Sequence, residues 1–471
     1  MAIKVFDFKD FSPGIVTVLP PHLSPAGSAT ICRNIDLSIK YGALVKRLGI
    51  AADVTVAAGN DPIEGLYEFP IIGGSTKTVA AHTGAVYDIT SGSSAIFTDA
   101  GLGGNPVNFT AFNNLLIIVN QGITTQKWTG TGLTANLLGS PPANVKYVEV
   151  HKRRVWMANS SAGASRLHYS AIDDPEDWTT TNNAGFIDID KNDGDSITGI
   201  ISIGEGLLIF KERSVHMLSG YDVPFTVKRL SSGVGCIAPR SIQRTEGFAL
   251  FMSTLGVFSA SPEGVSLVSY NIKPDVDGWT DAVKRATVGG RYRGQYWLSY
   301  DSDADGLNDR AYVLDYINGA WFEYTNIKAH VFFTKSDGAL YSGASDTSKT
   351  RKHNTGTDDL GSAITMTWRG RSEDFGIFSN DKQVHDISIF ALAITGKTLT
   401  VTIYKDGVVT GDDMSFPIDP VSSSTTVIAN QNAIQSDQGR LIQVEISNAE
   451  ASASVEVYGY SIMVDIRERQ D

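Results

Sequence analysis

Pairs of short apolar strands recur along the chain, and this repetition restricts the fold more than any other feature of the sequence. The pairs lie at residues 63–89, 107–128, 145–170, 197–219, 240–261, 286–324 and 327–344. Their first strands begin about 40 to 50 residues apart. The strands are joined by FNN, HKR, GEG, EG and KSDG, and tight hairpins select such small and polar residues. Helical periodicity is nearly absent, so the sequence predicts an all-β protein.

A hairpin repeat of this length is typical of a β-propeller, in which each repeat forms one four-stranded blade. A single blade cannot bury both of its faces, so blades pack around an axis until the ring closes. We predict a propeller of about seven blades, within a range of roughly six to eight, over residues 61–345. Residues 1–60 are an N-terminal arm whose strands could complete a blade. A pair of β-sandwiches is the competing architecture.

The composition and the hydrophobic pattern of the sequence change after residue 345. Residues 346–362 are polar, contain glycine and lack apolar periodicity, which favours a linker or a long loop. Apolar and polar residues then alternate at 364–372, 385–392, 398–407, 441–447 and 454–466. Such alternation indicates sheets with one buried face, so residues 363–471 are predicted to form a separate C-terminal β-sandwich.

The net charge argues against a protein that binds nucleic acid through its phosphate groups. The 471 residues carry a net charge of −12, and the densest basic cluster is HKRR at 151–154. Proteins that bind DNA through its phosphates usually show a basic excess. Asp7 and Asp10 interrupt the first residues, and no apolar run approaches the ~20 residues of a membrane span. These features predict synthesis in the cytoplasm without a membrane span.

An acidic loop at residues 301–309 is the strongest local signal for a ligand. Asp301, Asp303, Asp305 and Asp309 surround Gly306, and the flanking segments read as strands. Carboxylates at this spacing supply the oxygen ligands that Ca²⁺ prefers, although Tyr312 stands where an EF-hand has its glutamate. The spacing resembles the calcium-binding hairpin loops in the propeller of integrin α subunits. We expect a structural Ca²⁺ here, with an unoccupied acidic turn as the alternative, and no other cofactor. Residues 188–196 are a weaker candidate.

No convergent catalytic motif appears in the sequence. The eight histidines are scattered, and neither a G-x-S-x-G elbow nor a P-loop is present. The stretch SAIDDPEDW (170–178) lacks the spacing of a sialidase-type Asp-box; it is better explained as a turn whose acids cap backbone amides while Trp178 fills a gap between blades. We therefore expect no enzyme. A propeller glycosidase stays an alternative, because its carboxylates would come from different blades.

Several longer phrases resemble tail-associated structural proteins of tailed bacteriophages. They include residues 23–50, 148–158, RLHYSAIDDPEDWTTT (166–181), 197–222, 233–242 and 251–261. Their order is similar to the nozzle or tail-hub proteins of short-tailed phages, whereas the acidic loop at 301–309 departs from that pattern. The resemblance implies a homo-hexameric ring of propeller subunits below the portal and adaptor, in the virion tail. Viral DNA would pass through the ring without sequence-specific binding.

Besides the glycosidase, two functions are open at the level of the sequence. The first is a structural tail component, a nozzle or hub that lines the DNA-exit channel. The second is a tail-tip propeller that binds a host surface glycan or protein. A sixfold ring would favour the first, and a trimer would favour the second.

Overall fold

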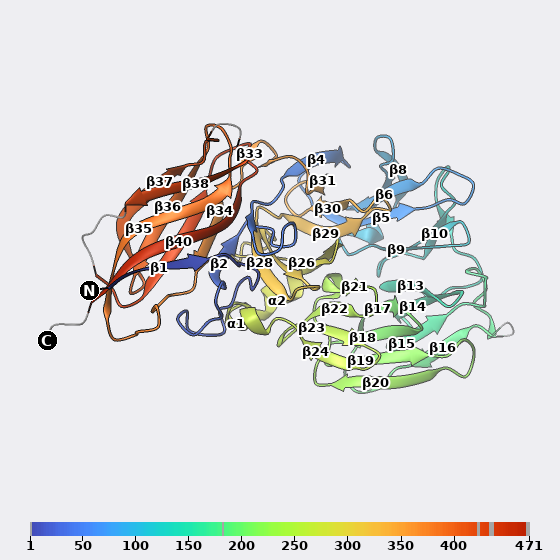
Figure 1. Ribbon diagram of the computed structural model, residues 1–471. Helices are drawn as coiled ribbons and strands as arrows, with labels where there is room; N and C mark the ends of the chain where they lie inside the picture. Colours follow the sequence, from blue (N-terminus) through green and yellow to red (C-terminus); the bar gives the residue numbers. More distant parts are fainter. Residues whose placement is uncertain (1, 181–182, 422–423, 433–437, 468–471) are drawn as a thin grey trace.

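The computed structural model describes residues 2–180, 183–421, 424–432 and 438–467. Within these residues the chain forms a seven-bladed β-propeller and a β-sandwich that lie side by side (Figure 1). The predicted all-β class, the propeller of about seven blades and the C-terminal sandwich are therefore confirmed. Two short helices, α1 (Lys273–Asp277) and α2 (Asp281–Ala286), connect blades 5 and 6.

Each of the first six blades consists of four consecutive antiparallel strands, which form a separate sheet in blades 1–5 and part of a nine-stranded sheet in blade 6. Blade 1 contains β5 (Ile63–Phe69), β6 (Lys77–His82), β7 (Ala85–Asp88) and β8 (Ser94–Thr98). Blade 2 contains β9 (Asn108–Phe112), β10 (Leu115–Val119), β11 (Gln126–Trp128) and β12 (Ala135–Asn136). Blade 3 contains β13 (Tyr147–His151), β14 (Arg154–Ser160), β15 (Gly163–Tyr169) and β16 (Gly185–Asp188). Blade 4 contains β17 (Ile197–Ile203), β18 (Gly206–Lys211), β19 (Ser214–Ser219) and β20 (Thr226–Ser232). Blade 5 contains β21 (Gln243–Arg244), β22 (Ala249–Ser253), β23 (Gly256–Ser261) and β24 (Gly264–Leu267). Blade 6 contains β25 (Val288–Tyr292), β26 (Gln295–Tyr300), β27 (Arg310–Asp315) and β28 (Ala320–Thr325).

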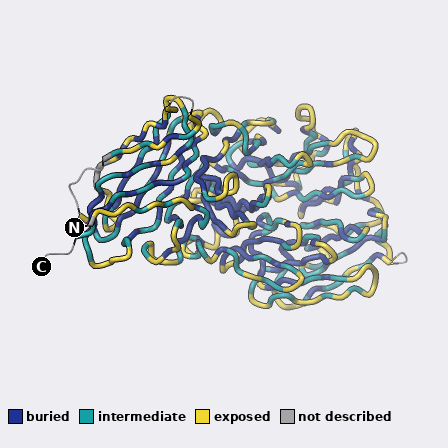
Figure 2. The backbone as a smooth tube through the Cα atoms, in the orientation of Figure 1, coloured by how far each residue is buried: buried dark blue, intermediate teal, exposed yellow. Residues whose placement is uncertain are grey.

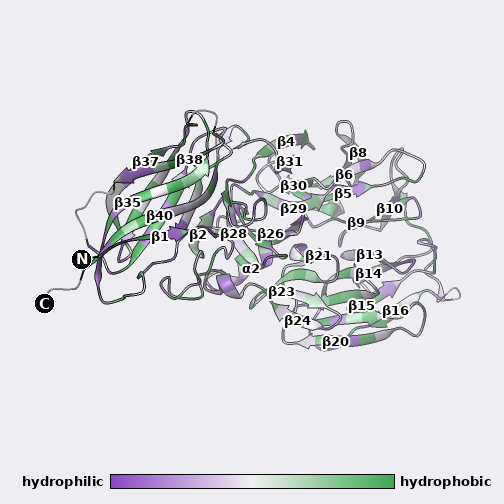
Figure 3. Ribbon diagram, viewed as in Figure 1, coloured by the Kyte–Doolittle hydropathy of each residue, from purple (hydrophilic) through white to green (hydrophobic). Residues whose placement is uncertain are grey.

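Local sequence explains both the hairpins and the close packing at the axis. In the turn between β9 and β10, Asn113 and Asn114 have φ values of 49° and 59°, a conformation that asparagine tolerates in tight hairpins. The first strand of each blade lies innermost, and these strands contact one another around the ring. A Cβ atom at Gly289 would lie 2.4 Å from the Ser241 carbonyl oxygen, so glycine allows neighbouring blades to approach. Hydrophobic residues are frequent in the blade strands (Figure 3), and clusters of them lie between blades 3 and 4 and between blades 4 and 5.

Blade 7 closes the ring with strands from both ends of the propeller sequence. It contains β29 (Ala329–Thr334), β30 (Leu340–Ala344), β31 (Lys349–His353) and β4 (Ile50–Thr55). In β4, Ile50 lies opposite His353 and Thr55 lies opposite Lys349. The expectation that a strand within residues 1–60 completes a blade is thus confirmed.

The interpretation of residues 346–362 as a linker is wrong, because β31 is the third strand of blade 7. The short strands β32 (Asp358–Asp359) and β33 (Ser362–Ala363) follow it. A search for apolar strands does not identify these segments, because they are polar. The polar side chains of β31 can form a strand here because other residues of the fold hydrogen-bond to them. Thr350 donates to Asp53, and His353 pairs with Ser342 at 2.8 Å. The propeller therefore needs residues on both sides of the predicted 61–345 range.

The sandwich consists of two sheets and includes the N-terminal segment. One sheet contains β1 (Ala2–Phe8), β3 (Leu44–Val45), β35 (Asp381–Leu392), β38 (Thr426–Asn432) and β40 (Glu456–Arg467). The other contains β2 (Ala29–Arg33), β34 (Met366–Gly370), β36 (Thr398–Lys405), β37 (Val408–Pro417) and β39 (Ile442–Asn448). The described residues within the predicted range 363–471 thus form the sandwich together with strands from residues 1–60.

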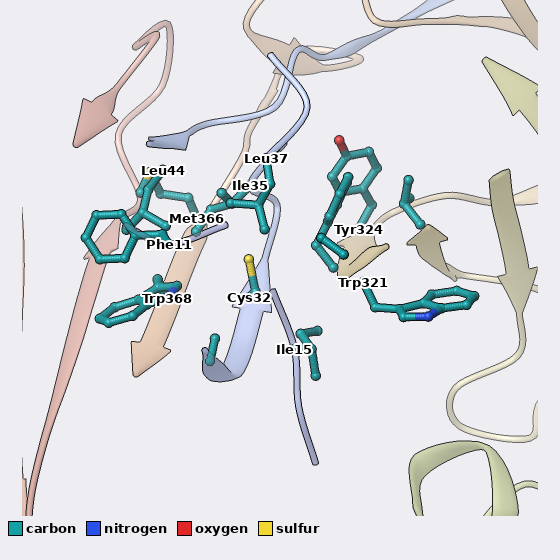
Figure 4. Close-up of a cluster of buried hydrophobic side chains, with 14 of the residues drawn as sticks. Phe11, Ile15, Cys32, Ile35, Leu37, Leu44, Trp321, Tyr324, Met366 and Trp368 are labelled. Atoms are coloured by element: carbon teal, nitrogen blue, oxygen red, sulfur yellow. The ribbon is translucent and has the colours of Figure 1, made fainter. Parts of the chain in front are cut away.

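A buried junction joins the two domains (Figure 2). Strand β2 continues the sheet of blade 6 through one parallel bridge between Arg33 and Glu323, and the Arg33 Nε lies 2.7 Å from the Glu323 carboxylate. Figure 4 shows Cys32 and Ile15 of the N-terminal segment between Trp368 of the sandwich and Trp321 of blade 6. One hydrophobic core therefore spans both domains.

Candidate functional site: the axial cavity and the Asp301 loop

The Asp301 loop connects β26 and β27 at the tip of a hairpin in blade 6. One carboxylate oxygen from each of Asp301, Asp303 and Asp305 lies within 4.8 Å of the others. Asp301 is buried, and its carboxylate accepts the backbone N–H of Ala304 at 2.7 Å and of Gly306 at 2.8 Å. These hydrogen bonds fix the loop so that the three acidic side chains converge.

Asp309 does not belong to this group. Its carboxylate accepts the backbone N–H of Ser302 at 2.9 Å and the Ser302 hydroxyl at 2.8 Å. The structure therefore brings together three of the four predicted ligands. Three carboxylates fit the donor chemistry of Ca²⁺, which takes about six to eight oxygen ligands and completes its shell with carbonyl groups and water.

The acidic residues of the weaker candidate, 188–196, are held in ion pairs instead. Asp188 pairs with Arg166 at 2.8 Å, and Asp193 pairs with the buried Lys211 at 2.6 Å. Asp195 accepts backbone N–H groups of the following hairpin. These contacts give the stretch a structural role in blades 3 and 4.

A cavity of about 580 Å³ lies on the propeller axis, near the Asp301 loop. All seven blades contribute to its wall, mainly through their innermost strands. Gly306 and Asn308 of the loop also line it, and the Asn308 amide donates to the backbone oxygen of Ala329 at 3.1 Å. Sequence reasoning did not find this cavity, because each blade supplies only a few residues and no local motif marks them.

A charged bridge crosses this cavity. Arg240, which precedes β21 of blade 5, forms an ion pair with Glu64 of blade 1 and donates to the His330 backbone oxygen of blade 7 at 3.1 Å. The His330 ring nitrogen lies 3.3 Å from the same Glu64 carboxylate. Burial alone would raise the pKa of Glu64, but the hydrogen bond from His330 and the charge of Arg240 hold it below its ordinary value.

A second carboxyl group in the cavity has a different environment. Burial raises the pKa of Glu149, on β13, to about 7, although Arg244 and the backbone N–H of Ser202 oppose the rise. Glu149 is therefore present in both protonation states near neutral pH. Tyr67 and Phe109 line the same cavity, and their rings stack with centroids 6.1 Å apart.

The DDPEDW stretch has the structural role that its residue types indicate. Asp174 accepts the backbone N–H of Glu176 at 2.9 Å, and Glu176 accepts the backbone N–H of Leu138 in blade 2. Trp178 packs against the core between blades 2 and 3. These contacts of the stretch therefore stabilise the packing of blade 2 against blade 3.

The HKRR cluster is a tight hairpin turn whose charges all have partners. Lys152 pairs with Glu205 at 2.9 Å, and Arg153 pairs with Asp173. Arg154 is fully buried and lies 2.6 Å from Asp222. These three basic side chains therefore stabilise blades 3 and 4.

Comparisons with known proteins add little about function. No protein-family model matches the sequence, and no curated protein matches it. Among solved structures, the computationally designed Ika8 protein is 13% identical, with a TM-score of 0.39 over 64% of this chain and 99% of that chain. The Pan2 WD40 domain of Neurospora crassa is 8% identical, with a TM-score of 0.41 over 66% of this chain and 97% of that chain. An exo-beta-1,3-galactanase from Phanerochaete chrysosporium is 10% identical, with a TM-score of 0.28 over 74% of this chain and 100% of that chain.

In the part of the chain that the structure describes, no helix has both the length and the apolar character needed to cross a membrane.

Proposed function

We propose that the protein is a structural component of a bacteriophage tail, a subunit of the nozzle or hub ring around the DNA-exit channel. The proposal gives it no catalytic role. Separate phrases within residues 23–261 resemble tail proteins, and one structural observation supports the same function. The N-terminal segment contributes strands to both the propeller and the sandwich and so connects them into a single rigid block. Strands β1–β3 pair within the sandwich, while β4 closes blade 7. A subunit that keeps its shape while DNA passes needs such a connection.

The axial cavity itself cannot be the DNA channel. Its volume is about 580 Å³, and the bridge from Arg240 to Glu64 crosses it. A duplex, whose major groove alone accommodates an α-helix, is far larger than this space. In our proposal the channel runs between copies of the chain, as in a homo-hexameric ring below the portal and adaptor.

The overall charge fits a channel that does not retain DNA. The chain carries a net charge of −12, and an acidic surface repels phosphate groups. Contacts in a closed ring are heterologous, so one surface of each subunit must match a different surface of its neighbour. Such a function would be spread over interfaces, without a single motif.

Stoichiometry tests the proposal. We expect electron cryomicroscopy of the phage particle to show six copies of this fold in one ring below the portal, with DNA passing between the copies. Three copies at the distal tip would contradict the ring. They would support the second candidate, a tail-tip propeller that binds a host glycan or protein, which the polar and aromatic lining of the axial cavity favours. Hydrolysis of capsular polysaccharide by the purified chain would contradict both.

A further inference from the structure

The polar groups in the axial cavity form a mixed set of hydrogen-bond donors and acceptors. The Asn108 amide nitrogen donates to the Lys146 backbone oxygen at 2.8 Å, and the Gln243 amide nitrogen donates to the Gly289 backbone oxygen at 2.9 Å. Each contact fixes the orientation of the amide. Both residues line the cavity, and in each the side-chain carbonyl oxygen can still accept a hydrogen bond.

Glu149 adds a carboxyl group that can either donate or accept a hydrogen bond. Its carboxyl is present in both protonation states near neutral pH, because burial raises its pKa to about 7. A carboxylate only accepts hydrogen bonds, whereas a protonated carboxyl also donates one. The cavity can therefore meet a group that both donates and accepts, as a hydroxyl does.

The charges of the cavity do not select for an ion. Arg240 is neutralised by Glu64, and Arg285 lies 2.7 Å from Glu212. The remaining charged residues of the wall are one basic residue, Lys146, and one acidic residue, Glu149. Among the residues that the structure describes, the acidic and histidine side chains of the wall do not gather into a set of metal ligands. These pairings disfavour both a simple anion and a metal cation, and they favour a neutral polar ligand.

Aromatic rings complete the wall. Tyr67 and Phe109, from blades 1 and 2, stack at an interplanar angle of 27° and are only partly buried. Partly open rings offer an apolar surface to C–H groups. The volume of about 580 Å³ falls within the range of roughly 300–1,000 Å³ that is usual for small-molecule sites.

We propose that the axial cavity binds a neutral sugar. Its hydroxyl groups contact Glu149, Asn108 and Gln243, and its C–H face packs against Tyr67 and Phe109. This inference deepens the second candidate function by naming its site, but it holds equally for a subunit of the ring. The copy number in the particle and sugar binding by the purified chain are separate measurements, so either result can fail without the other.

Saturation-transfer NMR on the purified full chain tests the site. The probes are methyl glycosides of glucose, galactose and N-acetylglucosamine, and inorganic phosphate is titrated separately. We expect saturable binding of at least one glycoside. Glu149→Gln and Gln243→Ala should each weaken it by about three- to tenfold, the effect of one lost hydrogen bond. The matched control Glu263→Gln, on an exposed turn of blade 5, should bind like the native chain.

Thermal unfolding of all variants establishes that they are folded. Two outcomes would overturn the proposal: no glycoside receives saturation, or folded Glu149→Gln and Gln243→Ala bind as tightly as the control. If no glycoside binds, binding of phosphate would show that the cavity is an anion site instead.

Discussion

Asp301 holds its loop through backbone hydrogen bonds, whereas Asp303 and Asp305 are exposed. A cation between the three carboxylates would relieve their mutual repulsion. We expect excess Ca²⁺ to stabilise the protein against urea, by about 2.7 kcal/mol at a concentration 100 times Kd. Asp303→Asn should remove most of this gain, because it deletes an exposed ligand without disturbing Asp301.

Asp309→Asn is the matched control for this measurement. Asp309 contacts Ser302 and lies outside the group of three carboxylates. The control should therefore keep its response to Ca²⁺. An equal loss of response in both variants, or a native chain that unfolds at the same urea concentration with Ca²⁺ and with EGTA, would contradict a structural calcium ion.

The sequence could predict that side chains close to one another in the chain form a common site. It could not predict which side chains from different blades meet across the ring. The three converging aspartates lie within five residues, so their spacing was visible. Glu64 and Arg240 are 176 positions apart, and only ring closure brings them together. The cavity, its bridge and the environment of Glu149 depend on strands from different blades, which no local pattern encodes.

The hairpin repeat predicted the strands well where they are apolar, as in β18 and β22, which are buried along their whole length, but it failed at β31. In that strand the buried positions are occupied by hydrogen-bonded polar residues such as Thr350 and His353. A search for apolar periodicity therefore misses it. For β4, the sequence indicated that the first 60 residues could supply a closing strand, but the pairing of Ile50 with His353 needed the structure.

Strand β4 offers a direct test of ring closure. Ile50 is buried, with 4% of its surface exposed, so Ile50→Ala removes packed side-chain atoms and leaves a cavity. We expect a loss of about 2–5 kcal/mol in the free energy of unfolding, measured by urea denaturation. Ile72→Ala changes the same residue type at a site that is 83% exposed and should stay within about 0.5 kcal/mol of the native chain. Equal stability of the two variants would show that β4 does not hold the ring.

At the scale of the whole molecule, the shared core predicts that propeller and sandwich unfold together. Trp321 is fully buried in blade 6, and its backbone oxygen accepts the Ile15 N–H of the N-terminal segment at 2.8 Å. We expect Trp321→Ala to cost about 3–5 kcal/mol and to reduce hydrogen-exchange protection in both domains. Protection should fall in β39 of the sandwich as well as in β26 of blade 6.

Trp128→Ala is the control for this coupling, because Trp128 is equally buried in the core of blades 1 and 2, away from the sandwich. Its largest effect should be confined to the propeller. Two separate calorimetric transitions in the native chain, or a Trp321→Ala variant whose sandwich keeps full protection, would contradict a common core.

The pairing of β1 with β40 sets the order in which the molecule can be completed during translation. Ala2 lies opposite Ile466, and β4 has to wait for β31. Strands β1 and β4 are thus translated long before the strands with which they pair. Blades 1–6 can form as they emerge, but β4 stays unpaired until β31 is made, and β1 stays unpaired until β40 is made. Such a chain depends on keeping these two unpaired strands out of intermolecular contacts while synthesis proceeds.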